Sequence, residues 1–159
     1  MDRVRSFAHP LVLVTGGEPL AQRHVIILLK ALLDEGYTTQ LETAGAHDIA
    51  PVPDGVSIIM DIKTPDSGEA ERNRWSNIDH LQSNDEIKMV INSQTDYEWA
   101  KKIIFEKGLA DLHVPILLSP SWHHLQAATL VTWILRDRLP VRLQVQQHKY
   151  IWDAEKTGV

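Results

Sequence analysis

The 159-residue sequence contains no cysteine. This absence excludes disulfide bonds, thiolate zinc sites, cysteine nucleophiles and cysteine-ligated iron–sulfur clusters within these residues. No apolar run approaches the ~20 residues that a membrane-spanning helix needs, so we expect no membrane association. The charged residues near Met1 are not followed by an apolar stretch, as they would be in a signal peptide. We therefore expect a cytoplasmic protein.

Positive charge is also in the minority. There are 16 Lys and Arg against 21 Asp and Glu, which gives a formal net charge of −5. This balance, with no long basic run, argues against a nucleic-acid-binding surface. The length suits one hydrophobic core, so residues 1–159 are interpreted as a single domain.

Strand-like and helix-like segments alternate along the chain. Strands are expected at Leu11–Val14, Thr38–Thr43, Val56–Met60, Glu86–Ile91, His113–Leu118 and Val141–Gln146. Helices are expected from Pro19 to Gly36, at Thr95–Lys107 and at Trp122–Arg138, while the polar stretch Thr64–Asp85 reads as a loop with a short helix at Trp75–Leu81. This alternation is typical of parallel strands joined by right-handed crossovers. The sequence therefore predicts an α/β fold with a parallel sheet.

Small and polar residues follow each expected strand. They are Thr15–Pro19, Glu42, Thr43, Gly45, Asp61, Lys63, Asn92, Ser93, Ser119, Ser121, Gln147 and His148. Strands end in polar turns in any fold, and carboxylates such as Glu42 and Asp61 serve as helix caps as well as acids or bases. In parallel α/β folds, however, ligands bind at the C-terminal ends of the strands. The repetition therefore predicts a site at this edge of the sheet.

The first of these strand ends reads VTGGEPL, residues 14–20. Gly16 and Gly17 would let the backbone approach a ligand closely and leave a carbonyl free to accept from an ammonium group. Glu18, held by Pro19, would add a negative charge. The combination suits an amino-acid-like cation. The alternative is an ordinary turn in which Glu18 favours a helix N-terminus and Pro19 opens the helix.

Other binding motifs are absent or weak. No Walker loop, GxGxxG or GxSxG pattern occurs. The rings of the adjacent His123 and His124 would point apart on a helix, and no histidine pair has the i,i+4 spacing of a zinc site. We therefore predict no metal ligands in this chain.

VTGGEPL resembles the GGEP motif of the radical S-adenosylmethionine superfamily. The stretches LETAG, MDIKTPDSGE, DEIKMVI, LLSPSW and LQVQQHKYIWD, with a terminal GV, resemble the 7-carboxy-7-deazaguanine synthase family, in order from Val12 to Val159. The resemblance implies conversion of 6-carboxy-5,6,7,8-tetrahydropterin to 7-carboxy-7-deazaguanine with loss of ammonia. It further implies S-adenosylmethionine as cofactor, a 4Fe–4S cluster that cleaves it, an assisting Mg²⁺ and a homodimer.

The resemblance also implies site residues. The cofactor would be bound by Gly16, Gly17, Glu18, Asp61, Ile62, Lys63, Ser119, Pro120, Ser121 and Trp122, and the substrate by Thr15, His148 and Val159. No catalytic residue is assigned.

The chain departs from the family at its N-terminal side. In the family, a segment before the GGEP strand carries the first barrel strand, the cluster cysteines and a magnesium-binding threonine. The resemblance therefore implies a partial parallel (β/α) barrel of the radical S-adenosylmethionine type that lacks the first strand and the cluster loop. It also implies that this chain alone is inactive.

Three interpretations follow. The chain is an enzyme completed by a missing segment, a binding module that holds S-adenosylmethionine or a pterin without chemistry, or a different radical-activating enzyme that shares only GGEP. The aromatic tail with Tyr150 and Trp152 would serve a dimer interface or pack on the chain's own core.

Overall fold

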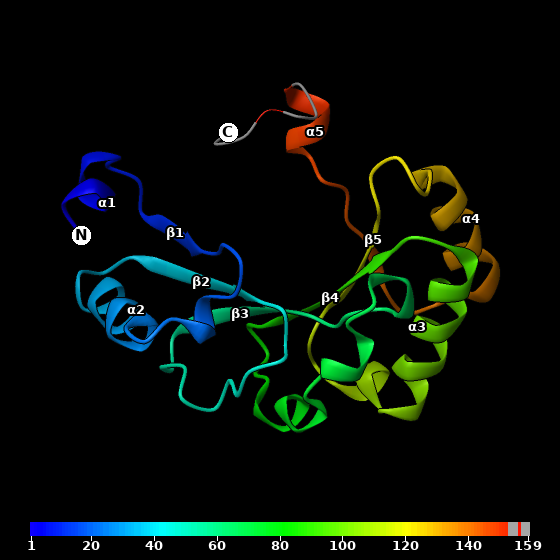
Figure 1. Cartoon of the computed structure of the whole chain (residues 1–159), viewed down its shortest axis with the longest axis horizontal. Coiled ribbons are helices and arrows are strands. Elements are labelled where there is room, and N and C mark those ends of the chain that lie inside the picture. The colour runs from blue at the N-terminus through cyan, green and yellow to red at the C-terminus, as the bar shows by residue number, and fades with distance from the viewer. Residues whose placement is uncertain (153–155, 157–159) are drawn as a thin grey trace.

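The structure is a computed structural model that describes residues 1–152 and 156. Its centre is a six-stranded, all-parallel sheet in the order β1-β2-β3-β4-β5-β6 (Figure 1). The strands are β1 (Leu11–Val14), β2 (Thr38–Thr43), β3 (Val56–Asp61), β4 (Glu86–Ile91), β5 (Ile116–Pro120) and β6 (Arg142–Leu143). β1 and β6 are edges that do not meet, so the sheet is an open part of a barrel. The predicted α/β fold and partial parallel barrel are confirmed.

Helices cover one side of this sheet. Figure 1 shows α2 (Val25–Asp34), α3 (Gln94–Glu106) and α4 (Ala127–Asp137) along its outer side. The short helix α1 (Asp2–Ser6) precedes β1, and α5 (His148–Ile151) lies across the open side after β6. Single 3-10 turns occupy Pro19–Ala21, Pro65–Ser67, Ala70–Arg72 and Leu109–Asp111, and a longer one spans Trp75–His80.

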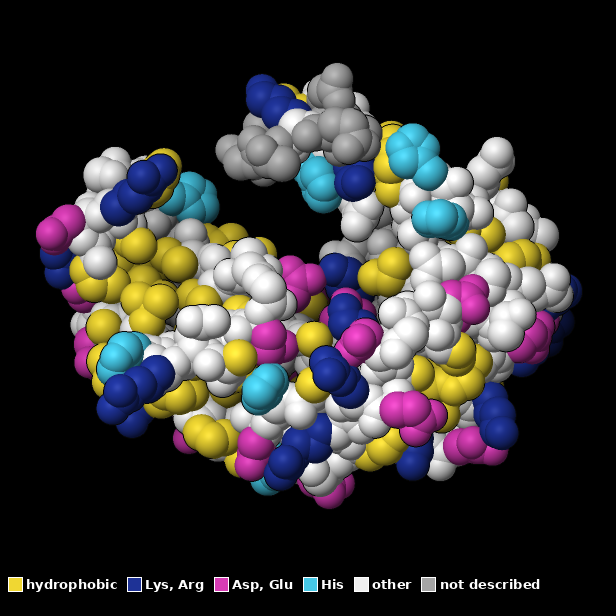
Figure 2. All heavy atoms as spheres, viewed as in Figure 1, with side chains coloured by type: hydrophobic (Ala, Val, Ile, Leu, Met, Phe, Trp, Pro, Cys, Tyr) yellow, Lys and Arg dark blue, Asp and Glu magenta, His cyan; other side chains and the backbone are white. Residues whose placement is uncertain are grey.

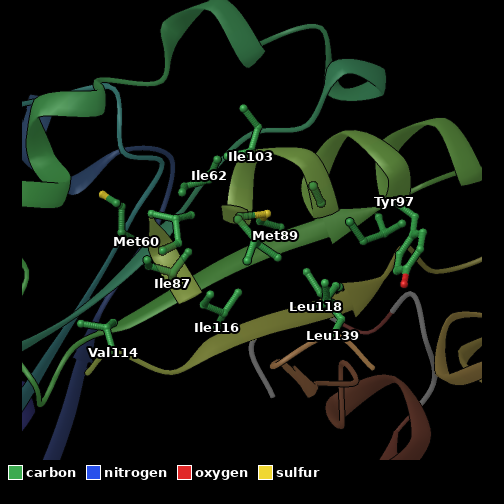
Figure 3. Close-up of a cluster of buried hydrophobic side chains, with 14 of the residues drawn as sticks. Met60, Ile62, Ile87, Met89, Tyr97, Ile103, Val114, Ile116, Leu118 and Leu139 are labelled. Atoms are coloured by element: carbon green, nitrogen blue, oxygen red, sulfur yellow. The ribbon is translucent and has the colours of Figure 1, made fainter. Parts of the chain in front are cut away.

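The core lies between the sheet and these helices. Alternate side chains of β3, β4 and β5 point outward into one buried cluster (Figure 3). Met60, Ile87, Met89, Ile116 and Leu118 share this cluster with Tyr97 and Ile103 of α3 and with Leu130 and Ile134 of α4. A smaller group, Val25, Leu29, Leu41 and Val56, joins α2 to the sheet. Full burial of one such side chain contributes roughly 1.5–3 kcal/mol, so the outer face holds the fold together.

Among the described residues, no helix packs along the inner face of the sheet. Leu11 and Leu13 of the edge strand β1 each remain 44% exposed. Further along the sheet, the inward positions carry Glu42, Lys88 and Ser119, which alternate with the buried core residues. This arrangement leaves the inner face available for ligands. We call it the trough.

Three segments differ from the prediction. The fifth strand begins at Ile116 rather than His113 and extends to Pro120. The helix expected from Trp122 begins at Ala127, because His123 has a φ of 66° and residues 121–126 form turns instead. The helix expected from Pro19 begins at Val25, after a separate 3-10 turn.

The last strand is also shorter than predicted. Arg142 and Leu143 pair with β5, and the Gln144 amide donates a final bond to the Leu118 carbonyl at 2.9 Å. The chain then leaves the sheet, and within the part of the chain that the structure describes β6 has no neighbour on its other side. The alternating pattern up to Gln146 was therefore misread as a full strand, and neither α1 nor α5 was predicted.

Candidate functional site

Most of the polar residues that follow the strands gather at one end of the trough, where three hollows adjoin. After β4, however, Asn92 lines a separate hollow and Ser93 caps α3. The first, of about 190 Å³, is lined by Thr15, Gly16, Gly17, Glu42, Thr43, Ala44, Asp61 and Lys63. The second, of about 620 Å³, is lined by Glu42, Lys88, Ser119 and residues 143–148. The third, of about 460 Å³, is lined by residues 120–127 with Val145, Gln146 and Tyr150. Figure 2 shows the molecule hollowed here, with acidic and basic side chains on the floor.

The glycine pair after β1 leaves open space in the first hollow. A Cβ atom on Gly16 or Gly17 would meet no atom within 4 Å. Gly16 also has a φ of +130°, which side chains rarely tolerate. The strand end is therefore built so that a ligand can lie directly against the backbone.

Glu18 ties this strand end to its neighbour. Its carboxylate accepts from the Thr43 hydroxyl at 2.9 Å and from the Ala44 amide at 2.7 Å, both at the end of β2. It also accepts from the Leu20 amide at 2.9 Å and so caps the 3-10 turn that Pro19 opens. The capping interpretation of Glu18 is confirmed. Both carboxylate oxygens of Glu18 accept hydrogen bonds from within the chain. Glu18 would therefore act on a ligand through its negative charge.

Asp61 and Lys63 lie on the opposite wall of the first hollow. Lys63 Nζ donates to Asp61 Oδ2 at 2.7 Å, whereas Asp61 Oδ1 is buried and has no partner among the described residues. Burial raises the pKa of Asp61, and the positive charge of Lys63 only partly opposes this rise. The pair offers one unused acceptor and one cation.

Ile62, between them, is buried in the core, and its backbone amide donates to the Lys88 carbonyl. Its side chain is therefore a structural part of the wall.

Glu42 and Lys88 form a second ion pair, with Nζ and Oε1 2.7 Å apart. Thr15 donates its hydroxyl to the other Glu42 oxygen at 3.3 Å. Glu42 belongs to both the first and the second hollow. Lys88 was missed from the sequence, although a lysine at an alternate position of the apolar stretch EIKMVI was a usable signal.

The end of β5 faces the other two hollows. Ser119, which is buried, and His148, which is exposed, line the second hollow. Pro120, Ser121 and Trp122 line the third hollow. The Trp122 ring packs edge-on against Tyr150, with centroids 5.2 Å apart. Tyr150 and Trp152 nevertheless remain 62% and 43% exposed and do not enter the core.

The remaining predicted substrate residue, Val159, lies outside the described residues. Gln144 and Gln146, which also line the second hollow, were not singled out from the sequence.

The residues present do not supply ligands for the metals that the resemblance implies. The sequence has no cysteine, so it does not fit a 4Fe–4S cluster. Within residues 1–152 and 156, no group of three His, Asp or Glu side chains could hold a metal ion. The same residues contain no helix that is long and apolar enough to cross a bilayer.

Comparison with known proteins identifies relatives, although no protein-family model matches the chain. It is 43% identical to a 7-carboxy-7-deazaguanine synthase of Chlorobaculum tepidum, over 100% of this chain and 73% of that protein. The proteins of the same name from Koribacter versatilis and Methanospirillum hungatei are 38% and 35% identical, over 94% and 88% of this chain and 72% and 58% of theirs.

Among solved structures, the fold matches Streptococcus suis SuiB with a TM-score of 0.57 at 11% identity, over 86% of this chain and 39% of SuiB. SuiB bound to S-adenosylmethionine matches with a TM-score of 0.54 at 12% identity, over the same shares of the two chains. These likenesses concern the fold alone. The sequence relatives decide the family, and this chain belongs to the 7-carboxy-7-deazaguanine synthase family.

Proposed function

We propose that the chain forms the cofactor and substrate walls of an enzyme that converts 6-carboxy-5,6,7,8-tetrahydropterin to 7-carboxy-7-deazaguanine. The observation that carries this proposal is the first hollow. Asp61 and Lys63 line the same hollow as Gly16 and Gly17, in front of which the space is open, and Asp61 Oδ1 has no partner among the described residues. A methionyl group carries an ammonium and a carboxylate, which complement these two side chains.

S-adenosylmethionine fits this donor set. The strand-end backbone and Asp61 would receive the methionyl ammonium, and Lys63 would hold the carboxylate. When bound, the cofactor supplies an adenosyl group on a sulfonium centre. The sequence has no cysteine to hold the 4Fe–4S cluster that the family uses to cleave it, and residues 1–152 and 156 contain no group of three His, Asp or Glu side chains that could hold magnesium. The cluster ligands would have to come from outside these residues.

The pterin is placed in the second hollow. Its wall contains Ser119 and His148, and it joins the first hollow at Glu42. Two ligands in these positions would meet side by side across the Glu42 carboxylate. Thr15 would orient that carboxylate through the hydrogen bond that it donates.

The family's homodimer and a cytoplasmic location belong to the same proposal. The open edge of β1, with Leu11 and Leu13 exposed, supports association with another chain. The formal charge of −5 favours solubility.

The absence of cysteine favours a second function for the 159 residues taken alone, namely binding of S-adenosylmethionine or a pterin without chemistry. The third interpretation, a different enzyme that shares only GGEP, loses its support because the relatives at 35–43% identity carry the synthase name.

Calorimetry with S-adenosylmethionine tests the proposal. Each hydrogen bond nets about 1 kcal/mol, whereas binding costs roughly 4 kcal/mol or more in lost freedom of motion. We therefore expect about millimolar affinity or weaker for the bare chain. Joining it to a family N-terminal segment that carries the cluster cysteines implied by the resemblance should raise the affinity and produce turnover.

In that joined protein, Gly17→Val should weaken cofactor binding at least about tenfold, the equivalent of one lost charged contact. A side chain at Gly17 has room in the fold but would fill the first hollow. Ala128→Val on the exposed surface of α4 is the matched control. Unchanged cofactor binding in Gly17→Val would show that the GGEP strand end is an ordinary turn.

A further inference from the structure

We infer that Trp122 and Tyr150 form a latch that positions His148 on the wall of the second hollow. Tyr150 is then a positioning residue, which acts on the ligand of the second hollow through His148. This inference rests on the proposed function, which places the pterin beside His148.

The helix α5 needs contacts outside its own segment to keep its place. Figure 1 shows it apart from the outer helices, at the end of an extended segment that follows β6. Its backbone hydrogen bonds, such as the 3.0 Å bond from the Trp152 amide to the His148 carbonyl, stay within residues 146–152. A helix of 4 residues is far shorter than the roughly 12–15 residues at which an isolated helix becomes even marginally stable in water. Another element must therefore hold α5.

Trp122 supplies such contacts from the loop after β5. The Tyr150 ring packs edge-on against the Trp122 ring, with centroids 5.2 Å apart and planes at 90°. The charge distribution of aromatic rings favours this geometry. Lys149 Nζ lies 5.7 Å from the centroid of the same ring, which is within the range of a cation–π interaction. Two successive residues of α5 thus contact one tryptophan of another element.

The backbone beside Trp122 is unusual. His123 has a φ of 66°, a left-handed conformation that residues other than glycine rarely adopt. Its ring packs against Trp122, with centroids 5.3 Å apart and planes at 71°. Backbone outliers of this kind cluster at ligand-binding and switch segments. The loop after β5 therefore carries a strained residue next to the ring that α5 contacts.

The latch connects two of the hollows. Trp122 and Tyr150 line the third hollow, whereas His148, from the same helix as Tyr150, lines the second. His148 and Tyr150 are two positions apart in α5. A shift of the Tyr150 ring away from Trp122 would therefore move His148 as well. The imidazole stays at the second hollow only while Tyr150 stays against Trp122.

A double-mutant cycle tests the inference, because it separates a direct effect from one that acts through another residue. Fluorescence titration with pterin-6-carboxylate, which stands in for the proposed substrate, gives dissociation constants for the 159-residue chain and its variants. His148→Ala and Tyr150→Ala should each weaken binding about tenfold, which corresponds to one lost hydrogen bond with a charged group. The double variant should bind no more weakly than His148→Ala alone.

Two variants keep the result interpretable. Tyr150→Phe retains the ring and should keep most of the affinity, because the edge-on contact is made by the ring. Ile151→Ala, at the next residue of α5, which is 65% exposed, is the matched control and should leave binding unchanged.

Unchanged binding in Tyr150→Ala, or a further loss when Tyr150→Ala is added to His148→Ala, would overturn the inference and leave the pterin site intact. Absence of a nuclear Overhauser contact between the Trp122 and Tyr150 rings in the ligand-free chain would do the same. If His148→Ala binds like the unsubstituted chain, the proposed role of His148 is wrong and the inference is wrong with it. If pterin-6-carboxylate binds neither the chain nor the joined protein, the whole proposed pterin site is wrong, and the latch has no ligand to act on.

Discussion

Asn73 and Lys63 form a reciprocal pair of hydrogen bonds between a side chain and a backbone. The Lys63 amide donates to Asn73 Oδ1 at 2.9 Å, and Asn73 Nδ2 donates to the Lys63 carbonyl at 2.8 Å. Just beyond the end of β3, the Asn73 side chain thereby pairs with the same backbone groups that a neighbouring strand would pair with in a sheet. The loop after β3 fixes the backbone that carries Lys63 into the first hollow.

Replacing Asn73 by Ala should therefore destabilise the chain by about 1–3 kcal/mol, because a partly buried donor and acceptor of Lys63 lose their partners. Urea unfolding measures the change. Asn84→Ala, at an exposed asparagine, is the control and should change stability by less than about 0.5 kcal/mol. Equal effects of the two substitutions would show that the pair with Lys63 contributes nothing.

Asp61 should make the stability depend on pH in a particular direction. Its pKa in the folded chain is raised above the ordinary value of 3.8, chiefly by burial. Its contribution to stability is therefore greatest below pH 3.8 and is lost as the pH rises through the raised folded value.

Asp61→Asn removes this titration, so the variant should be more stable relative to the unsubstituted chain, with a larger free energy of unfolding, at pH 7 than at pH 4. Urea unfolding at both values checks the sign. If the stability of the variant relative to the unsubstituted chain instead falls from pH 4 to pH 7, the folded chain favours the charged form of Asp61 and the prediction is wrong.

The chain should bind no 4Fe–4S cluster when it is treated anaerobically with iron and sulfide. Cluster iron is held by cysteine thiolates, and there are none here. Absorption spectra and iron analysis after desalting measure the outcome, with the cysteine-containing joined protein as the positive control. A stoichiometric brown chromophore that resists chelators would contradict this prediction.

The open edge of β1 should promote association of the chain in solution. Exposed strand edges pair with other chains, and a lysine on the edge opposes such pairing. Leu13→Lys, on the inner side of β1, should therefore reduce the concentration-dependent increase in mass seen by light scattering. Leu135→Lys, at a leucine of α4 that is 70% exposed, is the control and should not. A chain that stays monomeric at high concentration before any substitution would show that the edge does not associate.

Local pattern was sufficient for most of the sheet. Thr38–Thr43 and Glu86–Ile91 match their predicted bounds because alternate apolar side chains meet the helices on one face only. The same pattern failed after Leu143, since alternation does not reveal whether a strand has a second neighbour. The helix predicted from Trp122 was also placed too early, because the left-handed backbone of His123 interrupts it and the helix begins at Ala127.

The candidate site shows the same limit. The expectation that ligands bind at the C-terminal ends of the strands correctly predicted that Thr15, Asp61 and Lys63 lie together, because parallel strands end at one edge of the sheet. The Glu42–Lys88 pair was missed because it joins β2 to β4 across β3, a proximity that depends on the register of three strands. No window of sequence contains that information.

The strand order of the sheet is the order of the strands along the chain. Each new strand thus has one earlier partner, and that partner leaves the ribosome first. No strand has to be inserted between two others that have already paired, so the sheet can grow outward during synthesis by edge addition. A pause in translation would therefore leave a shorter sheet with the same pairing rather than a misthreaded one.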